Sequence, residues 1–379
     1  MIEDTFWQST PDPPPGLAAG NWHDGLMASA DPIRVAVVGP TGYAGYHLVD
    51  LLLRHPRVEL TALAARRDPP VDLRDEFPKL TGRLPAGVAT TVPIHADTLA
   101  DRADVAFLAL PHKASMAQVP GLLEAGMRVI DCSADYRLRT PELYEQTYGL
   151  PHTDPEHLAE AVYGLPELFR NDLPDARLVA MPGCYPTAAA LAVAPLLSRS
   201  LVEPTRIVIN ASCGVTGAGR TPAPALHFPT ANEAYGAYGT IGGHRHQPEI
   251  GQTLSRVAGR PVEPLFVPHL LPCDVGIAES IYLTPRDSQV TQADLFEAYE
   301  DAYGGEPFVR LRGPDGPLPN IKHVAGTNFV DLTVRLVGGE DTPIVCVFVC
   351  EDNLIKGTAG QAVQCLNAVM GWEETLGLL

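Results

Sequence analysis

The chain lacks the features that direct a protein to a membrane, to a nucleic acid or out of the cell. No apolar run approaches the roughly 18 residues of a membrane span. No lysine or arginine precedes Arg34, so the basic start of a secretory signal and the arginines of a transit peptide are both missing. The 27 basic residues are scattered among 45 acidic ones, with no basic stripe for a nucleic acid. We therefore expect a cytoplasmic protein without a membrane or nucleic-acid partner.

Cysteine usage and net charge narrow the chemistry further. Seven cysteines, an odd number spread over 379 residues, indicate reduced thiols rather than a disulfide framework. CxxC and HExxH spacings are missing, so no metal site is expected. The net charge of −18 repels anionic ligands. A phosphate-bearing ligand must therefore be captured by a few placed arginines or backbone amides.

Three regions follow one another along the chain. Residues 1–30 form a proline-rich extension, because prolines at 11 and 13–15 interrupt any regular pattern. Apolar strands at 33–38, 58–64, 105–110 and 128–132 then alternate with helical stretches, which predicts a parallel, doubly wound sheet. Beyond residue 184, strands at 207–210, 277–283, 328–336 and 344–350 predict a mostly antiparallel sheet, with one helix at 292–303.

The sequence thus predicts an α/β fold with a second, α+β domain. We expect a Rossmann-type nucleotide-binding domain formed by residues 31–183 together with 353–379, with the final helical stretch at 357–370 packed back onto it. Residues 184–352 are expected to form a catalytic and oligomerisation domain.

A glycine-rich turn follows the first strand. Gly39, Gly42 and Gly45, with Thr41 between them, have the spacing of a dinucleotide-binding turn. Gly39 permits the tight turn, whereas Gly42 and Gly45 let the backbone approach a pyrophosphate at the helix N-terminus.

The second strand ends in Arg66 and Arg67, where a site for NAD usually carries an acidic residue. Two guanidinium groups at that place favour a 2′-phosphate, hence NADP. A solvated surface pair is the alternative.

Cys184 lies where a helix is expected to begin. Pro186 suits a first helical turn, so Cys184 falls at or just before the N-cap. The free N–H groups and the positive end of the helix dipole stabilise a thiolate there. The sequence therefore indicates a nucleophile, with a small buried cysteine in a turn as the alternative.

His244 and His246 flank Arg245 in a glycine-rich approach to a probable helix. They could supply a proton beside a bound anion, whereas residues two apart do not share a helix face for a metal. A thiol, a histidine and a nicotinamide site define a reaction class, in which the thiolate attacks an acyl carbon and hydride moves between the resulting adduct and the cofactor. Reductive cleavage of an acyl phosphate fits, as does its reverse.

Five segments together resemble the N-acetyl-γ-glutamyl-phosphate reductase family of arginine biosynthesis, which is related to the aspartate-semialdehyde dehydrogenases. They lie at residues 39–45, 131–137, 182–187, 243–250 and 352–357, and the resemblance runs from about Ile33 to the C-terminus. It implies NADPH-dependent reduction of N-acetyl-γ-glutamyl phosphate to N-acetylglutamate semialdehyde with release of phosphate, in a homo-oligomer (dimer or tetramer).

The same resemblance assigns roles to individual residues. Cys184 is the nucleophile and His244 the acid/base, with His246 as the second choice. The further binding residues that it implies are Asn353 at the nicotinamide amide and Ser133, Arg137 and His246 at the substrate or phosphate.

One departure and two rival functions remain. Val275 stands where the family has an arginine before the glycine, so a substrate contact from that position is in doubt. One rival is the related reductase of an aminoadipyl or carrier-protein-linked glutamyl phosphate, although the acidic net charge disfavours an acidic carrier. The other is a catalytically silent nucleotide-sensing module, which the presence of both Cys184 and His244 disfavours.

Overall fold

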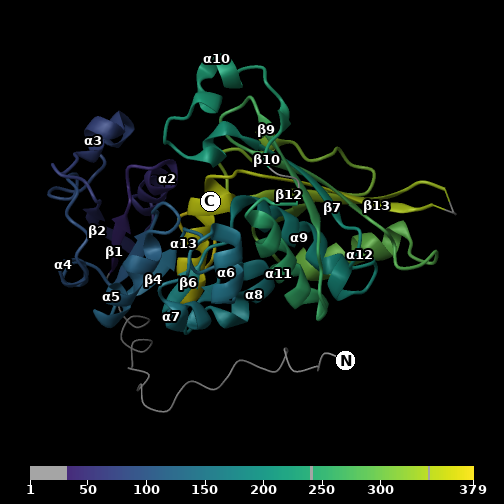
Figure 1. Cartoon of the computed structure of the whole chain (residues 1–379), viewed down its shortest axis with the longest axis horizontal. Coiled ribbons are helices and arrows are strands. Elements are labelled where there is room, and N and C mark those ends of the chain that lie inside the picture. Colours follow the sequence, from purple (N-terminus) through teal and green to yellow (C-terminus); the bar gives the residue numbers. More distant parts are fainter. Residues whose placement is uncertain (1–31, 240–241, 340–341) are drawn as a thin grey trace, which may run out of the picture.

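Two β-sheets organise the chain in the computed structural model, which describes residues 32–239, 242–339 and 342–379 (Figure 1). The extension expected at residues 1–30 lies outside the described residues. Both sheets have helices packed on them, and the chain passes from the first sheet to the second through one long helix, α9 (Cys184–Ser198).

The first sheet is parallel throughout, with the strand order β2-β1-β3-β4-β6-β5. The predicted doubly wound sheet is therefore confirmed, although the third and fourth strands end earlier than expected. The two shortest strands, β5 and β6, were missed because two or three residues carry no periodic signal. The strands are β1 (Ile33–Val38), β2 (Val58–Ala64), β3 (Val105–Leu108), β4 (Arg128–Asp131), β5 (Val162–Tyr163) and β6 (Leu178–Ala180).

Helices cover both faces of this sheet. On one face α2 (Tyr43–Leu52) packs beside α13 (Gly360–Val369), whose buried residues share a core with Val35 and Val37 of β1. A π-helical turn at Ile355–Ala359 leads into α13. The other helices of this half are α3 (Leu73–Glu76), α4 (Ala96–Ala100), α5 (Val119–Glu124), α6 (Pro141–Tyr148), α7 (Pro155–Glu160) and α8 (Pro166–Phe169).

The second sheet has the order β11-β12-β13-β10-β7-β9-β8. It is antiparallel except for the pairs β11–β12 and β7–β9, so the prediction of a mostly antiparallel sheet is confirmed. Its long strands run to the right in Figure 1, with α9, α11 (His246–Ala258) and α12 (Gln292–Tyr303) below them. The strands are β7 (Val208–Gly214), β8 (Gly236–Ala237), β9 (Leu265–Leu271), β10 (Ile277–Leu283), β11 (Val309–Leu311), β12 (Val330–Val337) and β13 (Ile344–Glu351).

Helix α9 is apolar on all sides because it lies between other elements. Every residue from Tyr185 to Leu197 is buried, and the helix packs against α11, α12 and strands β10 and β13. A helix that is hydrophobic all round is stable only in such an interior position. Its burial fixes the direction of its N-terminus, which carries Cys184. In the described residues no helix is both long and apolar enough to cross a bilayer.

Candidate active site

Cys184 is the first residue of α9, and Gly183 is the N-cap. The expectation that the thiol lies at or just before the N-cap is therefore wrong by one residue. The reason is that Gly183 takes the extended N-cap conformation and donates its N–H to Glu249 Oε1 at 2.7 Å. The thiol nevertheless lies at the positive end of a long helix, where an anion is stabilised.

The surroundings of Cys184 lower the pKa of its thiol. The largest contribution comes from the neighbouring thiol of Cys213, and the backbone N–H of Tyr185 adds to it. The positive charges of Arg137 and Arg245 also favour the thiolate, while burial opposes it. Cys184 is partly exposed and lines a cleft.

One buried carboxylate, Glu249 of α11, fixes the turn that precedes Cys184. Besides the Gly183 N–H, its Oε1 accepts the hydroxyl of Tyr163 at 2.8 Å, and its Oε2 lies 3.5 Å from Arg137 Nη1. Arg137 also donates from Nε to the backbone oxygen of Met181 at 2.6 Å. Because a buried charge is tolerated only when it is paired, these contacts lock α11 and α9 together. Sequence reasoning quoted Glu249 within a motif but gave it no role.

A cleft of about 900 Å³ connects the glycine turn after β1 with Cys184. It brings together most of the predicted residues, namely Gly39, Thr41, Gly42, Arg66, Arg67, Arg137, Cys184, His246 and Asn353. Gly45, Ser133 and His244 are not among the residues that line it. Side chains far apart in the sequence thus share one continuous space.

The glycines of the turn have different tasks. Gly39 has a φ of +88°, and a Cβ there would lie 2.5 Å from the backbone oxygen of Ala109, so only glycine fits. Gly42 is the N-cap of α2 and has open space beside it. Gly45 is a packing position, since a Cβ there would lie 2.2 Å from Gly39 O. Two of the three predicted glycines therefore face the cleft, and the third holds the helix against the turn.

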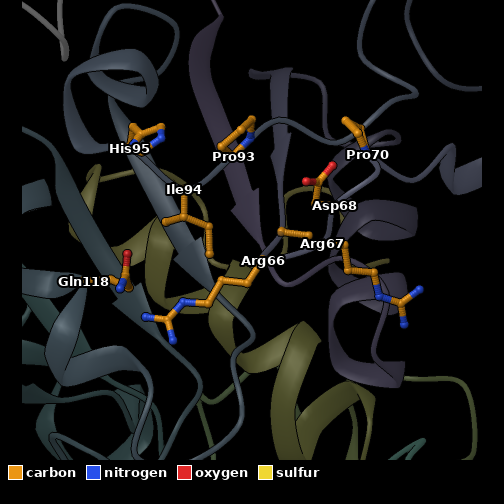
Figure 2. Close-up of a pocket in the computed structure, with 9 residues that line it drawn as sticks. Arg66, Arg67, Asp68, Pro70, Pro93, Ile94, His95 and Gln118 are labelled. Atoms are coloured by element: carbon orange, nitrogen blue, oxygen red, sulfur yellow. The ribbon is translucent and has the colours of Figure 1, made fainter.

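The two arginines after β2 point in different directions (Figure 2). Arg67 forms an ion pair with Glu76 at 2.9 Å. Arg66 extends toward the side of Gln118, is exposed and forms no ion pair within the described residues. Both line a smaller hollow of about 640 Å³ that continues into the main cleft. Arg66 is therefore the guanidinium that is free to meet an anion.

The two histidines of the second motif have different positions. His246 lies against the turn before Cys184, because a Cβ on Gly183 would be 2.6 Å from its Nε2. His244 accepts the His246 N–H on Nδ1 at 3.2 Å and packs edge-on against the rings of Tyr185 and Tyr238. Burial lowers the pKa of His246 well below its ordinary value, and burial with nearby Arg245 lowers that of His244 to about 4. Both imidazoles are thus neutral near pH 7.

Two further predicted residues are held by the protein itself. Asn353 is buried in the cleft wall, where its Oδ1 accepts the N–H of Gly276 at 2.8 Å and its Nδ2 donates to Thr216 Oγ1 at 3.1 Å. Ser133 is buried and donates to Asp131 at 2.7 Å, which orients the loop after β4. The structure therefore places Ser133 behind the cleft wall.

Several cleft residues were missed by sequence reasoning. The loop after β7 contributes residues 216–222, and Arg220 in it donates to Thr41 O at 2.9 Å and pairs with Glu76 at 2.6 Å. The glycine-rich run before Arg220 was the available signal. His112 also lines the cleft, and burial with nearby Arg137 lowers its pKa to about 3. Within the described residues no group of carboxylate, histidine and cysteine side chains could hold a metal ion.

Comparisons with known proteins agree with this architecture. The model of the semialdehyde dehydrogenase NAD binding domain matches residues 34–176, and that of the semialdehyde dehydrogenase dimerisation domain matches residues 184–353. N-acetyl-gamma-glutamyl-phosphate reductase of Citrifermentans bemidjiense is 44% identical over 91% of this chain and 98% of that protein. The protein of the same name from Desulforudis audaxviator is 46% identical over 92% of this chain and 98% of its own length.

The chain belongs to the N-acetyl-γ-glutamyl-phosphate reductase family. Solved structures of aspartate semialdehyde dehydrogenases have a fold similar to that of this chain. Aspartate semialdehyde dehydrogenase II from Vibrio cholerae is 17% identical with a TM-score of 0.65, over 90% of this chain and 99% of that one. The Candida albicans enzyme, solved with NADP, has a TM-score of 0.63 at 15% identity, over 90% of this chain and 99% of that one.

Proposed function

We propose that the protein reduces N-acetyl-γ-glutamyl phosphate to N-acetylglutamate semialdehyde with NADPH and releases phosphate. The observation that carries this proposal is the single cleft that joins a dinucleotide-type glycine turn to a thiol of lowered pKa. Family membership supports the acyl phosphate as the substrate, because the curated relatives that cover the same length carry that name.

The residues of the cleft fit a nicotinamide dinucleotide. Gly39 permits the tight turn after β1, and Gly42 leaves the N-terminus of α2 open for a pyrophosphate. The unpaired Arg66 suits a 2′-phosphate, which favours NADP over NAD. Asn353 and Cys184 line the same cleft, so Asn353 would hold the nicotinamide amide. When bound, the cofactor supplies the hydride.

Cys184 begins the reaction as the nucleophile. Its thiolate attacks the acyl carbon, a C–S bond forms and the C–O bond to phosphate breaks, which leaves a thioester on the enzyme. After hydride reaches the thioester carbon, the oxyanion collapses, the C–S bond breaks and the aldehyde leaves. The thiolate is thereby regenerated.

We assign proton transfer to His246 rather than to His244. The imidazole of His246 lies beside Gly183 in the cleft and is neutral, so it can accept the Cys184 proton and pass it to the departing phosphate oxygen. A ring N–H of the same neutral imidazole would also donate a hydrogen bond to the later oxyanion. His244 supports it from behind through its Nδ1. This assignment reverses the order expected from the sequence, because only His246 reaches the cleft.

The assembly and location follow from the same family. We propose a homo-oligomer built through the second domain, since a dimerisation-domain model matches it and half-exposed Leu265, Tyr282 and Val337 lie on its sheet. Seven free thiols suit the reducing cytoplasm.

The test is nicotinamide absorbance with purified protein. N-acetyl-γ-glutamyl phosphate should oxidise NADPH with stoichiometric phosphate release, and aminoadipyl or carrier-linked glutamyl phosphates should react far more slowly. If either of these substrates reacted faster than N-acetyl-γ-glutamyl phosphate, the protein would instead be one of the related reductases. NADPH binding without turnover of any of them would indicate a nucleotide-sensing module.

A further inference from the structure

A loop of the second domain is tied to the first domain across the cleft. The loop comprises residues 216–222, which follow β7 and line the cleft opposite the glycine turn after β1. Arg220 in this loop donates from Nη1 to the backbone oxygen of Thr41 at 2.9 Å and to Glu76 Oε2 at 2.6 Å. Thr41 belongs to the glycine turn and Glu76 is the last residue of α3. One guanidinium therefore bridges the two walls of the cleft.

The end of this bridge in the first domain is a fixed surface. The Arg220 guanidinium lies over the ring of Phe77, 4.7 Å from its centroid. Phe77 packs against the core of the first domain, and its ring lies 4.6 Å from that of Tyr46 in α2. The other oxygen of the Glu76 carboxylate accepts from Arg67 at 2.9 Å. An ion pair, a hydrogen bond to the backbone and a cation–π contact thus hold Arg220 together.

The end in the second domain is fixed only at the base of the loop. The hydroxyl of Thr216 donates to the backbone oxygen of Asp274 at 2.6 Å and accepts Nδ2 of Asn353 at 3.1 Å. Residues 217–222, beyond this base, are exposed. Arg220 therefore connects the exposed part of the loop to the first domain.

The bridge crosses the cleft where the middle of a dinucleotide would lie. The proposed function puts the 2′-phosphate at Arg66, the pyrophosphate at Gly42 and the nicotinamide beside Cys184, all of which line the cleft. Thr41, the residue that Arg220 contacts, directly precedes Gly42. A ligand that extends to both sides of a bridge can leave only after the bridge opens.

We propose that Arg220 and Glu76 are positioning residues that close the cleft over the bound nicotinamide cofactor and set the rate at which it exchanges. The inference rests on the proposed function, in which the dinucleotide lies along this cleft. Because the bridge joins protein to protein, it opens before the cofactor enters and again before NADP⁺ leaves. Loss of the bridge therefore speeds association and dissociation alike and leaves the dissociation constant nearly unchanged.

The experiment measures association and dissociation of NADPH by stopped-flow fluorescence on the full-length protein. Arg220→Gln loses the whole bridge, so both rate constants should rise by about 3- to 30-fold. Glu76→Gln loses only the ion pair, so both should rise by about 2- to 5-fold. The double variant should behave like Arg220→Gln alone, because Glu76 contributes to the bridge only through Arg220.

Arg83→Gln is the matched control. Arg83 pairs with Asp50 at 2.6 Å, and its exposure is close to that of Arg220, but both partners belong to the first domain. Cofactor exchange in this variant should equal that of the wild type. NADH is followed alongside NADPH, because it has no 2′-phosphate that an Arg67 released from Glu76 could meet.

Exchange at the wild-type rate in Arg220→Gln would overturn the proposal. A raised dissociation constant with an unchanged association rate constant would overturn it too, because that pattern indicates a direct contact between Arg220 and the cofactor. Additive effects in the double variant would show that the two side chains act separately, again against the proposal. The measurement needs no acyl phosphate. A protein whose cofactor exchange responds as expected but which reduces no acyl phosphate would therefore refute only the proposed function.

Discussion

Cofactor preference can be tested by separating the two arginines that follow β2. The sequence treats Arg66 and Arg67 as a pair, but the structure distinguishes them, because Arg67 is held by Glu76 at 2.9 Å and Arg66 forms no ion pair in the described part of the chain. We therefore expect Arg66→Ala to lose most of the preference for NADPH over NADH. Arg67→Ala is the matched control, with the same charge change at the neighbouring position.

The expected change in cofactor preference follows from the contact that each guanidinium makes. A hydrogen bond to a charged group contributes about 1.5 to 3 kcal/mol. Arg66→Ala should thus lower the ratio of kcat/KM for NADPH to that for NADH by about 10- to 150-fold, since about 1.4 kcal/mol corresponds to tenfold. Arg67→Ala removes a half-exposed ion pair, and such pairs contribute about 0 to 1 kcal/mol. Its ratio should change by less than about fivefold.

The assay is initial-rate kinetics with both cofactors at saturating acyl phosphate, together with direct titration of NADP⁺ by calorimetry. Because NADH has no 2′-phosphate, its kcat/KM should be nearly unchanged in both variants. Equal losses in the two variants would show that Arg67 leaves Glu76 to join the phosphate. An unchanged ratio in Arg66→Ala would refute the assignment of this hollow to the 2′-phosphate.

Five further variants test the site. Cys184→Ser should abolish aldehyde formation while NADPH binding, followed by fluorescence, persists, because an alkoxide forms far less readily than a thiolate; phosphate release at the wild-type rate would exclude a nucleophilic role. His246→Asn should lower kcat by about 10²- to 10⁴-fold with little change in substrate KM, whereas His244→Asn should lower kcat much less. A larger loss in His244→Asn than in His246→Asn would assign proton transfer to His244. Glu249→Gln should lower the free energy of unfolding by about 3 to 5 kcal/mol in urea titrations, since its buried arginine partner loses its counter-charge; an unchanged denaturation midpoint would contradict this. Burial raises the pKa of Glu279 in the folded state, so the free energy of unfolding should fall as pH rises above the unfolded pKa, by at most about 1.4 kcal/mol per pH unit. Glu279→Gln should remove this slope. Parallel stability curves for the two proteins between about pH 5 and about pH 8 would show that the carboxyl is not protonated in the fold.

The fold was largely predictable because its elements carry strong local patterns. The strand at Ile33–Val38, the strand at Ile277–Leu283 and the helix at Gln292–Tyr303 match the expected bounds. Apolar runs bounded by glycine, proline or a capping residue define these elements without tertiary information. Strand β9 was missed although it has seven residues, because Pro268 and His269 interrupt its apolar pattern. The place of β9 beside β7 in the strand order of the second sheet was therefore not predicted.

The site was predictable in its residue types but not in its contacts. Ser133 was a candidate only through the family resemblance, and its hydroxyl turns inward to Asp131 because that buried carboxylate needs donors. A local motif can identify the side chain that carries a reactive group. The residue that orients this side chain belongs to another element, and tertiary packing brings the two together.

The two histidines illustrate the same limit and its physical origin. His244 precedes α11 and His246 is its first residue, so their side chains leave the backbone in different directions that spacing alone does not fix. The direction is set by Glu249, one turn further along α11, whose bond to the Gly183 N–H spans 66 residues of sequence. That bond holds the start of α11 against the start of α9, which brings His246 Nε2 to the glycine before Cys184. Cys184 and the imidazole of His246 are therefore positioned by one buried carboxylate, and neither motif specifies the site without the other.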